Sequence, residues 1–294
     1  MVMADTPKPG RAGLMPEEVD ALLAGTWYRR VGFVGRGGMG EVHVVEHTHL
    51  GCSFALKVLH PRLGRFADRF RVEAQALGCV NHPNVVGVVD FWITPSSVPC
   101  IIMDLLNGHT LAREFEDRKG LPIAEAIDLS CQTLAALSAA HSAGLVHRDI
   151  KPEHLFLHQE PGGGRVLKVL DFGLTRVLPR SEAKFPRPPA IPTDTGTVVG
   201  SPRYMSPEAA RGERVDGRAD LYAVGLILYE MLCGVGPYDH DDVALPPSRR
   251  SQQAVPAELD RIAMRAIHER PSDRFQTADD MLLELVGFQT RRSM

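Results

Sequence analysis

The sequence predicts an α+β protein with a smaller part rich in β-strands and a larger part that is mostly α-helical. Residues 34–106 contain short apolar and β-branched runs separated by glycine, proline and asparagine, a pattern typical of strands joined by turns. Residues 121–286 contain longer apolar segments that begin near proline or end near glycine, as helices do. Strands that lie mainly in the first part of the chain and helices that lie mainly in the second indicate the α+β class.

Composition restricts the classes of function. The chain has 294 residues, enough for one or two domains, and its 44% hydrophobic and 23% charged residues are ordinary for a globular protein. The formal net charge of −3 gives no support to a nucleic-acid or membrane partner, so neither is expected. The five cysteines form no Cys-x-x-Cys pair, so we expect no zinc site, no disulfide framework and a cytoplasmic location.

Signals for secretion or membrane insertion are not expected either. The N-terminus has Asp5 and early prolines without an apolar stretch, which argues against a signal peptide. The most apolar run, residues 221–235, is interrupted by Glu230 and is too short to span a bilayer. We therefore predict that this run is a buried helix.

A glycine-rich stretch follows a short predicted helix at residues 16–23. Gly35, Gly37 and Gly40 form the pattern G-x-G-x-x-G, and a β-branched run after them predicts a hairpin rather than a helix. Such a hairpin can lay backbone N–H groups over phosphates, because no side chain blocks the approach. The alternative is a flexible glycine-rich turn.

A lysine and a glutamate follow the hairpin. Lys57 lies in a predicted strand, residues 54–59, and Glu73 lies in a predicted helix, residues 66–77. A lysine kept from solvent needs a carboxylate partner, which Glu73 can provide. Two alternatives are that Lys57 is a solvated charge at a sheet edge and that Glu73 pairs with Arg69 on the helix surface.

The remaining elements are predicted from their apolar patterns and end signals. Strands are expected at residues 85–92, 99–106 and 166–170, and helices at 121–141, 256–267 and 277–286. Gly162, Gly163 and Gly164 mark a hairpin tip before the strand at 166–170. The last helix opens with Thr277 and Asp280, which have the spacing of a capping box.

The stretch His147-Arg148-Asp149-Ile150-Lys151-Pro152-Glu153-His154 is the one around which the site is predicted to form. An aspartate lies two residues from a lysine, in a loop between a helix and the short apolar run 155–157. Such a loop can hold a carboxylate still beside a cation. This arrangement suits phosphoryl transfer, where catalysis is mostly positioning and charge stabilisation.

This stretch resembles the H-R-D-x-K-P-x-N loop of serine/threonine protein kinases. Asp171-Phe172-Gly173 follows Asp149 by 22 residues, and Ser206-Pro207-Glu208 stands where kinases have A-P-E. With the glycine-rich hairpin, these signatures make residues 28–286 similar to a bacterial-type serine/threonine protein kinase. The resemblance implies a bilobal fold: an N-terminal extension (1–26), a β-rich N-lobe with one main helix (27–104), a helical C-lobe (105–288) and a tail (289–294).

The resemblance also implies roles for single residues. Lys57 would bind the α- and β-phosphates of ATP and Glu73 would hold Lys57, while Asp149 would accept the proton of a substrate hydroxyl. Lys151 would stabilise the γ-phosphoryl group, and Asp171 would bind magnesium. The implied ATP-contacting residues, besides Lys57, are Val34, Gly35, Gly37, Gly38, Gly40, Val42, Ala55, Met103, Asp104, Leu106 and Phe156.

Further residues are expected to support this site. Residues 174–200 resemble an activation segment, in which Thr193, Thr195 and Thr197 are candidate phosphorylation sites; the alternative is that they are solvated loop residues. Asp220 is expected to hydrogen-bond the backbone of the catalytic loop. Glu208 is expected to pair with Arg274. The partners implied are protein substrates and a second copy of the chain, in a dimer that autophosphorylates in trans.

His154 departs from the family pattern, which has an asparagine that binds a second metal ion. The histidine either binds a metal with manganese preferred over magnesium, or leaves one metal site empty, or marks a pseudokinase that binds ATP as a scaffold. Since Lys57, Glu73, Asp149, Lys151 and Asp171 are all present, an active but weakened kinase is favoured.

Overall fold

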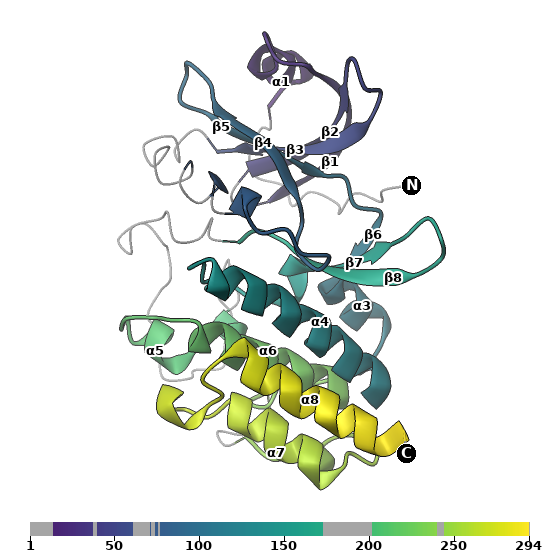
Figure 1. Cartoon of the computed structure of the whole chain (residues 1–294), viewed down its shortest axis with the longest axis vertical. Coiled ribbons are helices and arrows are strands. Elements are labelled where there is room, and N and C mark those ends of the chain that lie inside the picture. Colours follow the sequence, from purple (N-terminus) through teal and green to yellow (C-terminus); the bar gives the residue numbers. More distant parts are fainter. Residues whose placement is uncertain are drawn as a thin grey trace. The chain divides into compact units, whose positions relative to one another are not determined.

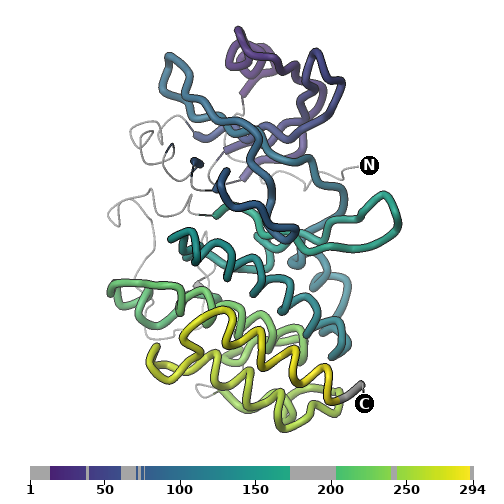
Figure 2. The backbone as a smooth tube through the Cα atoms, viewed as in Figure 1, coloured from purple at the N-terminus to yellow at the C-terminus, as the bar shows by residue number. Residues whose placement is uncertain are grey.

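The computed structural model of the protein describes residues 14–37, 40–60, 71, 74–75, 77–172, 202–239 and 244–293. The chain forms two compact units, each assembled from three segments. The first, here called the strand unit, comprises residues 1–81, 86–108 and 158–164; the second, the helical unit, comprises residues 82–85, 109–157 and 165–294. Figure 2 follows the chain from the purple end, in the strand unit, to the green and yellow end, in the helical unit. The prediction of an α+β protein is confirmed.

The strand unit contains a five-stranded sheet with the order β1-β2-β3-β5-β4, and each neighbouring pair is antiparallel (Figure 1). The strands are β1 (Tyr28–Gly37), β2 (Gly40–His47), β3 (Ser53–Leu59), β4 (Val88–Ile93) and β5 (Pro99–Asp104). The predicted hairpin is confirmed, since Gly37 of β1 pairs with Gly40 of β2.

The two faces of this sheet differ in their side chains. Residues directly opposite each other in antiparallel strands project to the same face. Lys57 is opposite both Val42 and Ile101, and Ala55 is opposite Met103, so these residues share one face. The other face carries the hydrophobic core of the unit, which consists of Val45, Leu56, Val58, Val98, Cys100 and Ile102 together with Val19 and Leu23.

Helix α1 (Pro16–Leu22) supplies Val19 to that core, and Leu23 follows the helix. Proline at its first position and Glu17 and Glu18 in its first turn explain its start, as predicted. The predicted helix at 66–77 is described only in part, and residues 71, 74, 75, 77 and 78 are helical.

The helical unit is built around α6 (Arg218–Cys233), whose residues 219–232 are all buried. The prediction of a buried apolar helix is therefore confirmed. This helix packs against α4 (Ile123–Ser142) and α7 (Ala257–Ala266), and α8 (Ala278–Ser293) packs against the same two helices. Figure 1 shows these four helices stacked with similar inclinations. Two short helices, α3 (Leu111–Asp117) and α5 (Pro207–Ala210), complete the helical part.

A second, three-stranded sheet has the order β6-β7-β8, with β6 (Gly108–Thr110), β7 (Leu155–Gln159) and β8 (Arg165–Val169). The predicted glycine hairpin joins β7 to β8, and the carbonyl oxygen of Gly164 accepts a hydrogen bond from the N–H of Glu160. On β7, Leu155 and Leu157 are buried, whereas Phe156 between them faces the opposite side.

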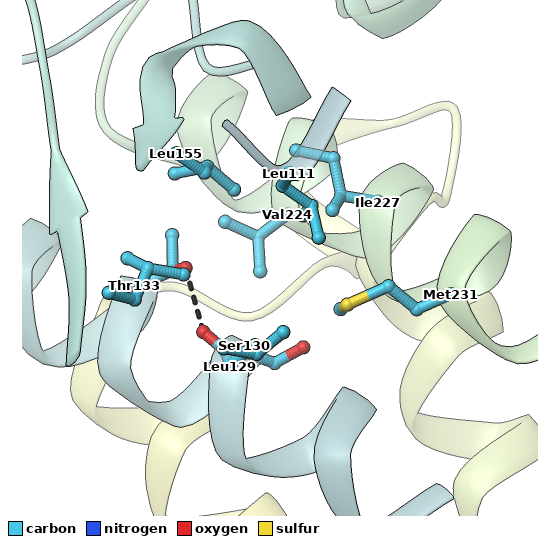
Figure 3. A pocket seen from close by; sticks show the side chains of 9 residues that line it. Leu111, Leu129, Ser130, Thr133, Leu155, Val224, Ile227 and Met231 are labelled. Atoms are coloured by element: carbon cyan, nitrogen blue, oxygen red, sulfur yellow. Dashed lines mark hydrogen bonds between the residues drawn. The ribbon is translucent and has the colours of Figure 1, made fainter. Parts of the chain in front are cut away.

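A pocket inside the helical unit lies between α3, α4, α6 and β7 (Figure 3). Its walls are apolar except for Ser130 and Thr133, whose hydroxyls donate to carbonyl oxygens of their own helix at 2.8 Å. The pocket has no room for a water molecule. It is therefore a gap in core packing and not a ligand site.

Candidate active site

The catalytic loop is held by Asp220, at the start of α6, as the sequence predicts. The carboxylate accepts the N–H of His147 at 2.9 Å and the N–H of Arg148 at 2.7 Å. Nε2 of His141 donates to the same carboxylate at 2.9 Å. Asp220 is only 1% exposed, so these three donors stabilise a buried charge that would otherwise be costly. The loop backbone is thus fixed before any substrate arrives.

Sequence reasoning missed His141. It lies in the last turn of α4, where a basic residue also favours the helix dipole, so its position indicates no specific partner. The hydrogen bond to Asp220 joins α4 to α6 across 79 positions of the chain. Only the tertiary structure brings the two side chains together.

His147 connects the catalytic loop to the segment that carries Asp171. The fully buried ring donates from Nε2 to the carbonyl oxygen of Leu170 at 2.8 Å. Its Nδ1 lies 3.3 Å from the N–H of Asp149, and its ring packs against Phe172 with centroids 4.8 Å apart. His147 thus contacts the backbone of Asp149 and the residues on both sides of Asp171.

Asp149 and Lys151 form an ion pair at the surface of the loop. Nζ of Lys151 lies 2.8 Å from Oδ2 of Asp149, and the two side chains are 24% and 30% exposed. The carboxylate has a cation beside it and remains accessible to a hydroxyl group from solvent. This geometry permits Asp149 to receive a proton while Lys151 interacts with a nearby anion.

The ring of His154 has a defined orientation. Its Nδ1 lies 2.7 Å from the carbonyl oxygen of Asp149, so Nδ1 carries a proton and donates it. Burial lowers the pKa of His154 to about 4, despite the opposing effect of the Asp171 carboxylate. In the neutral ring, Nε2 keeps its lone pair and lies 3.9 Å from Oδ2 of Asp171. These two atoms are electron-pair donors that one cation can bind.

The backbone at this site is strained. Among the described residues, only Ser97, Arg148 and Asp171 combine a positive φ with a side chain, and the values for Arg148 and Asp171 are +67° and +59°. A positive φ is unfavourable for residues other than glycine and persists where the surroundings enforce it. Here Asp220 fixes Arg148, and the bond from His147 to Leu170 fixes the residue before Asp171.

In the strand unit, Lys57 is 6% exposed, so the alternative of a solvated edge charge is wrong. It lies on the sheet face that also carries Val42, Ala55 and Met103. Asp104, which is also predicted to contact ATP, forms two hydrogen bonds with Gly87. The N–H of Asp104 donates to the carbonyl oxygen of Gly87 at 3.0 Å, and the N–H of Gly87 donates to Oδ2 of Asp104 at 3.0 Å. These residues therefore occupy fixed positions on one sheet.

Several predicted residues lie outside the described residues. They are Gly38, Glu73, Gly173, Thr193, Thr195 and Thr197. Whether Glu73 pairs with Lys57 or with Arg69 stays a prediction for this reason.

The predicted pair of Glu208 and Arg274 is confirmed. Two nitrogens of Arg274 each lie 2.8 Å from one oxygen of Glu208, so the pair is bidentate. Arg274 is 1% exposed and also donates to the carbonyl oxygens of His268 and Glu269. The pair fixes α5 to the segment that precedes α8.

The described residues also limit what a metal site could contain. Within them, no group of three or more histidine, cysteine or acidic side chains is placed to hold a metal ion. A magnesium ion, however, needs only one or two protein carboxylates when substrate phosphates complete its shell. Asp171, with His154 beside it, fits that requirement.

In the described part of the chain, helices that are long and apolar enough to cross a membrane are absent.

Comparison with known proteins gives consistent matches. The family model described as protein kinase domain matches residues 28–288. The chain is 38% identical over 263 residues to serine/threonine-protein kinase Pkn1 of Myxococcus xanthus, covering 84% of this chain and 36% of that protein. It is 34% identical over 270 residues to serine/threonine-protein kinase PknB of Mycobacterium leprae, covering 86% and 41%. The chain thus spans less than half the length of these two relatives.

Among solved structures, the crystal structure of the PknI kinase domain of Mycobacterium tuberculosis is similar to this chain. The TM-score is 0.69 at 27% sequence identity, and the match covers 89% of this chain and 95% of that one. The likeness includes the β-sheet part and the helical part.

Proposed function

Because the chain belongs to the protein kinase family, in its bacterial-type serine/threonine group, we propose that it transfers the γ-phosphoryl group of ATP to serine or threonine hydroxyls of proteins. The family uses ATP and a divalent metal ion in general. The observation that supports this activity best is the pair of Asp149 and Lys151 at 2.8 Å, on a loop that buried Asp220 holds through two backbone N–H groups.

Each residue of this loop has a proposed task. Asp149 orients the incoming hydroxyl and accepts its proton as the oxygen attacks phosphorus. Lys151 stabilises the charge that spreads over the γ-phosphoryl oxygens. Asp220 contributes by preorganisation, since the loop needs no rearrangement at the moment of reaction.

In the strand unit, Lys57 is proposed to bind the α- and β-phosphates, and the glycine-rich hairpin is proposed to cover them with its N–H groups. Ala55, Met103 and the backbone of Asp104 and Leu106 are proposed to contact adenine. The position of Val42, Ala55 and Met103 on the face of Lys57 supports these assignments.

Asp171 and His154 are the proposed metal residues. A bound divalent ion would supply positive charge that offsets the phosphate charge of ATP. The carboxylate of Asp171 suits magnesium, whereas the imidazole nitrogen of His154 suits softer ions such as manganese. The neutral ring supports binding, because a protonated histidine would repel a cation. We therefore expect activity with both ions and a preference for manganese.

A second candidate function is an ATP-binding scaffold without efficient transfer. The observation that favours it is His154 in the place of the family's asparagine. An active but weakened kinase is preferred here, because the other charged groups are present in the sequence and Nε2 of His154 lies 3.9 Å from Oδ2 of Asp171, close enough for one cation to contact both atoms.

The experiment that separates the two candidates uses purified protein and radiolabelled ATP, with the Asp149→Asn variant as control. Transfer to the chain itself or to a generic protein substrate, lost in Asp149→Asn, is the expected result. Mass spectrometry should then find phosphate on Thr193, Thr195 or Thr197. ATP-dependent thermal stabilisation without any transfer would instead support the scaffold.

A further inference from the structure

The segment before the family-matched region reaches the tip of the glycine-rich hairpin, where its backbone contacts the side chain of Glu41. Family similarity begins at residue 28, whereas residues 14–23 already pack on the outer face of the strand unit. Val19 and Leu23 lie in the core of that face, and Asp20 pairs with Arg30 of β1 at 3.1 Å. The segment is thus a part of this unit, and its first described residue reaches the hairpin.

Glu41 makes this contact. It directly follows the last glycine of the pattern, and it is 7% exposed. Alternate residues of β2 are buried, so Glu41 points to the core face with His43 and Val45, away from the face of Lys57. A carboxylate at the tip of a hairpin would ordinarily be solvated. Its burial therefore requires partners that stabilise the charge.

Those partners come from two different segments. Oε1 of Glu41 accepts the N–H of Leu14 at 2.9 Å and Nε–H of Arg36 at 3.0 Å. Arg36 is the residue directly opposite Glu41 across the hairpin. His43 lies nearby, with Nε2 3.3 Å from Oε2, but neither of its nitrogens forms a hydrogen bond within the described part of the chain.

We propose that Glu41 is a positioning residue for ATP, which fastens the glycine-rich hairpin to the segment 14–23 through one shared carboxylate oxygen. The inference rests on the proposed function, in which this hairpin covers the phosphates. A hairpin that is attached to the sheet core keeps its N–H groups in place. The entropic cost of ordering the loop when ATP binds is then smaller, so ATP binds more tightly. Because Glu41 faces away from Lys57, it acts through the hairpin and not by touching the nucleotide.

Two test variants and two controls examine this proposal. Leu14→Pro removes the backbone N–H that donates to Glu41, since proline has none, and Leu14→Ala is its matched control with the N–H retained. Glu41→Met keeps the approximate length and volume of the side chain and removes both oxygen acceptors. Asp20→Ala removes the ion pair with Arg30 of β1, which lies away from the hairpin tip, and controls for loss of attachment in general.

Two measurements are made on each variant. Hydrogen exchange of residues 32–44 in the nucleotide-free protein reports hairpin mobility and does not depend on activity. Binding of a fluorescent ATP analogue and steady-state kinetics report affinity and the division between KM and kcat. We expect faster exchange and roughly fivefold weaker ATP binding in Leu14→Pro and Glu41→Met, with kcat unchanged and both controls close to the parent. The double variant of Leu14→Pro with Glu41→Met should bind ATP no more weakly than Glu41→Met alone, because both changes remove the same hydrogen bond.

Unchanged exchange in both test variants would overturn the proposal. So would faster exchange with unaltered ATP affinity, or effects of the two changes that simply add. A parent protein that binds ATP without transferring phosphate would contradict the proposed kinase activity, but the affinity comparison would still test Glu41. A parent that binds no ATP would overturn both.

Discussion

At the scale of single residues, His154 has the largest consequence for chemistry. Its Nδ1 is committed to the carbonyl oxygen of Asp149, so only Nε2 can face Asp171. An asparagine at this place would offer a neutral oxygen, which magnesium prefers over an imidazole nitrogen. Under the proposed function, we therefore expect histidine at this position to shift the preference from magnesium to manganese.

The first prediction is that His154→Asn raises turnover in magnesium by about tenfold and reduces the advantage of manganese. The reason is that the new oxygen ligand suits the harder ion. Initial rates of phosphate transfer, measured in each metal at saturating ATP, test this expectation. His268→Asn, at an exposed histidine of the same unit, should leave the rates unchanged. A His154→Asn protein no faster than the parent in either metal would contradict the role given to His154.

Sequence alone located the residues that belong to short motifs. Asp149, Lys151 and Asp171 were found because they lie in short motifs that resemble those of protein kinases. The contacts of Asp220 and the pair of Glu208 and Arg274, which the same resemblance implies, are as predicted. The contacts of His141 and Glu41 were not predictable from spacing. Their partners lie 79 and 27 positions away, and one of them is a backbone N–H that every residue but proline possesses.

At the scale of elements, the close approach of β2 and β3 depends on Gly40. A Cβ atom at Gly40 would lie 2.0 Å from the carbonyl oxygen of Val58 and 2.9 Å from Cα of Leu59. Both neighbours are backbone atoms, which cannot move without displacing β3. Since Val42 is paired with Lys57 two residues further along, the spacing of these strands also sets the position of Lys57.

The second prediction is that Gly40→Ala destabilises the strand unit by about 2 kcal/mol, because the two strands must separate to admit the methyl group. Thermal unfolding and hydrogen exchange of the nucleotide-free protein measure this without any effect of bound phosphates. Gly37→Ala is the matched control, since a Cβ there would have nothing within 4 Å. Equal stability of the two variants would show that β2 and β3 tolerate the extra atom.

Most elements were predictable because their end signals are strong. The proline and acids of α1, and Thr277 and Asp280 before α8, are seen in their predicted roles; Thr277 and Asp280 exchange hydrogen bonds at 3.0 and 3.1 Å. Helix α3 was missed, since it has seven residues and only the weak contact of Thr110 with the N–H of Arg113 marks its start. The strand predicted at 85–92 begins later, at Val88, because Gly87 bonds to Asp104 instead.

At the scale of the whole molecule, the sequence predicts a β-rich part and a helical part, and each has its own core in the structure. It does not predict that residues 82–85 belong with the helical unit. There the side chain of Asn84 donates to Gln132 of α4 and to the carbonyl oxygen of Leu167 of β8, at 2.9 and 2.8 Å. Such polar contacts between distant segments have no periodic pattern, so they are invisible until the chain is folded.

The helical unit contains a buried charge pair, formed by Glu208 and Arg274. Burial alone would raise the pKa of Glu208, but the two hydrogen bonds and the positive charge of Arg274 more than offset this, so the pKa lies below its usual value of 4.5. A carboxyl whose pKa is lower in the folded state stabilises the fold above its unfolded pKa. That contribution is lost as the pH falls through the folded pKa.

The third prediction follows from this sign. Glu208→Gln should lower the free energy of unfolding of the helical unit by about 3–5 kcal/mol at pH 7, because it leaves the buried guanidinium of Arg274 without its counter-charge. The difference in unfolding free energy between the variant and the parent should narrow as the pH falls below 4.5. At such pH the carboxyl of Glu208 binds a proton when the parent unfolds, which favours unfolding of the parent. Urea denaturation from pH 7 to acid, followed by hydrogen exchange in α5 and α6, measures both effects. Glu213→Gln, which alters an exposed pair with Arg211, should change stability by less than about 0.5 kcal/mol at every pH. A pH-independent difference for Glu208→Gln would mean that shape, and not charge, is what Arg274 requires from its partner.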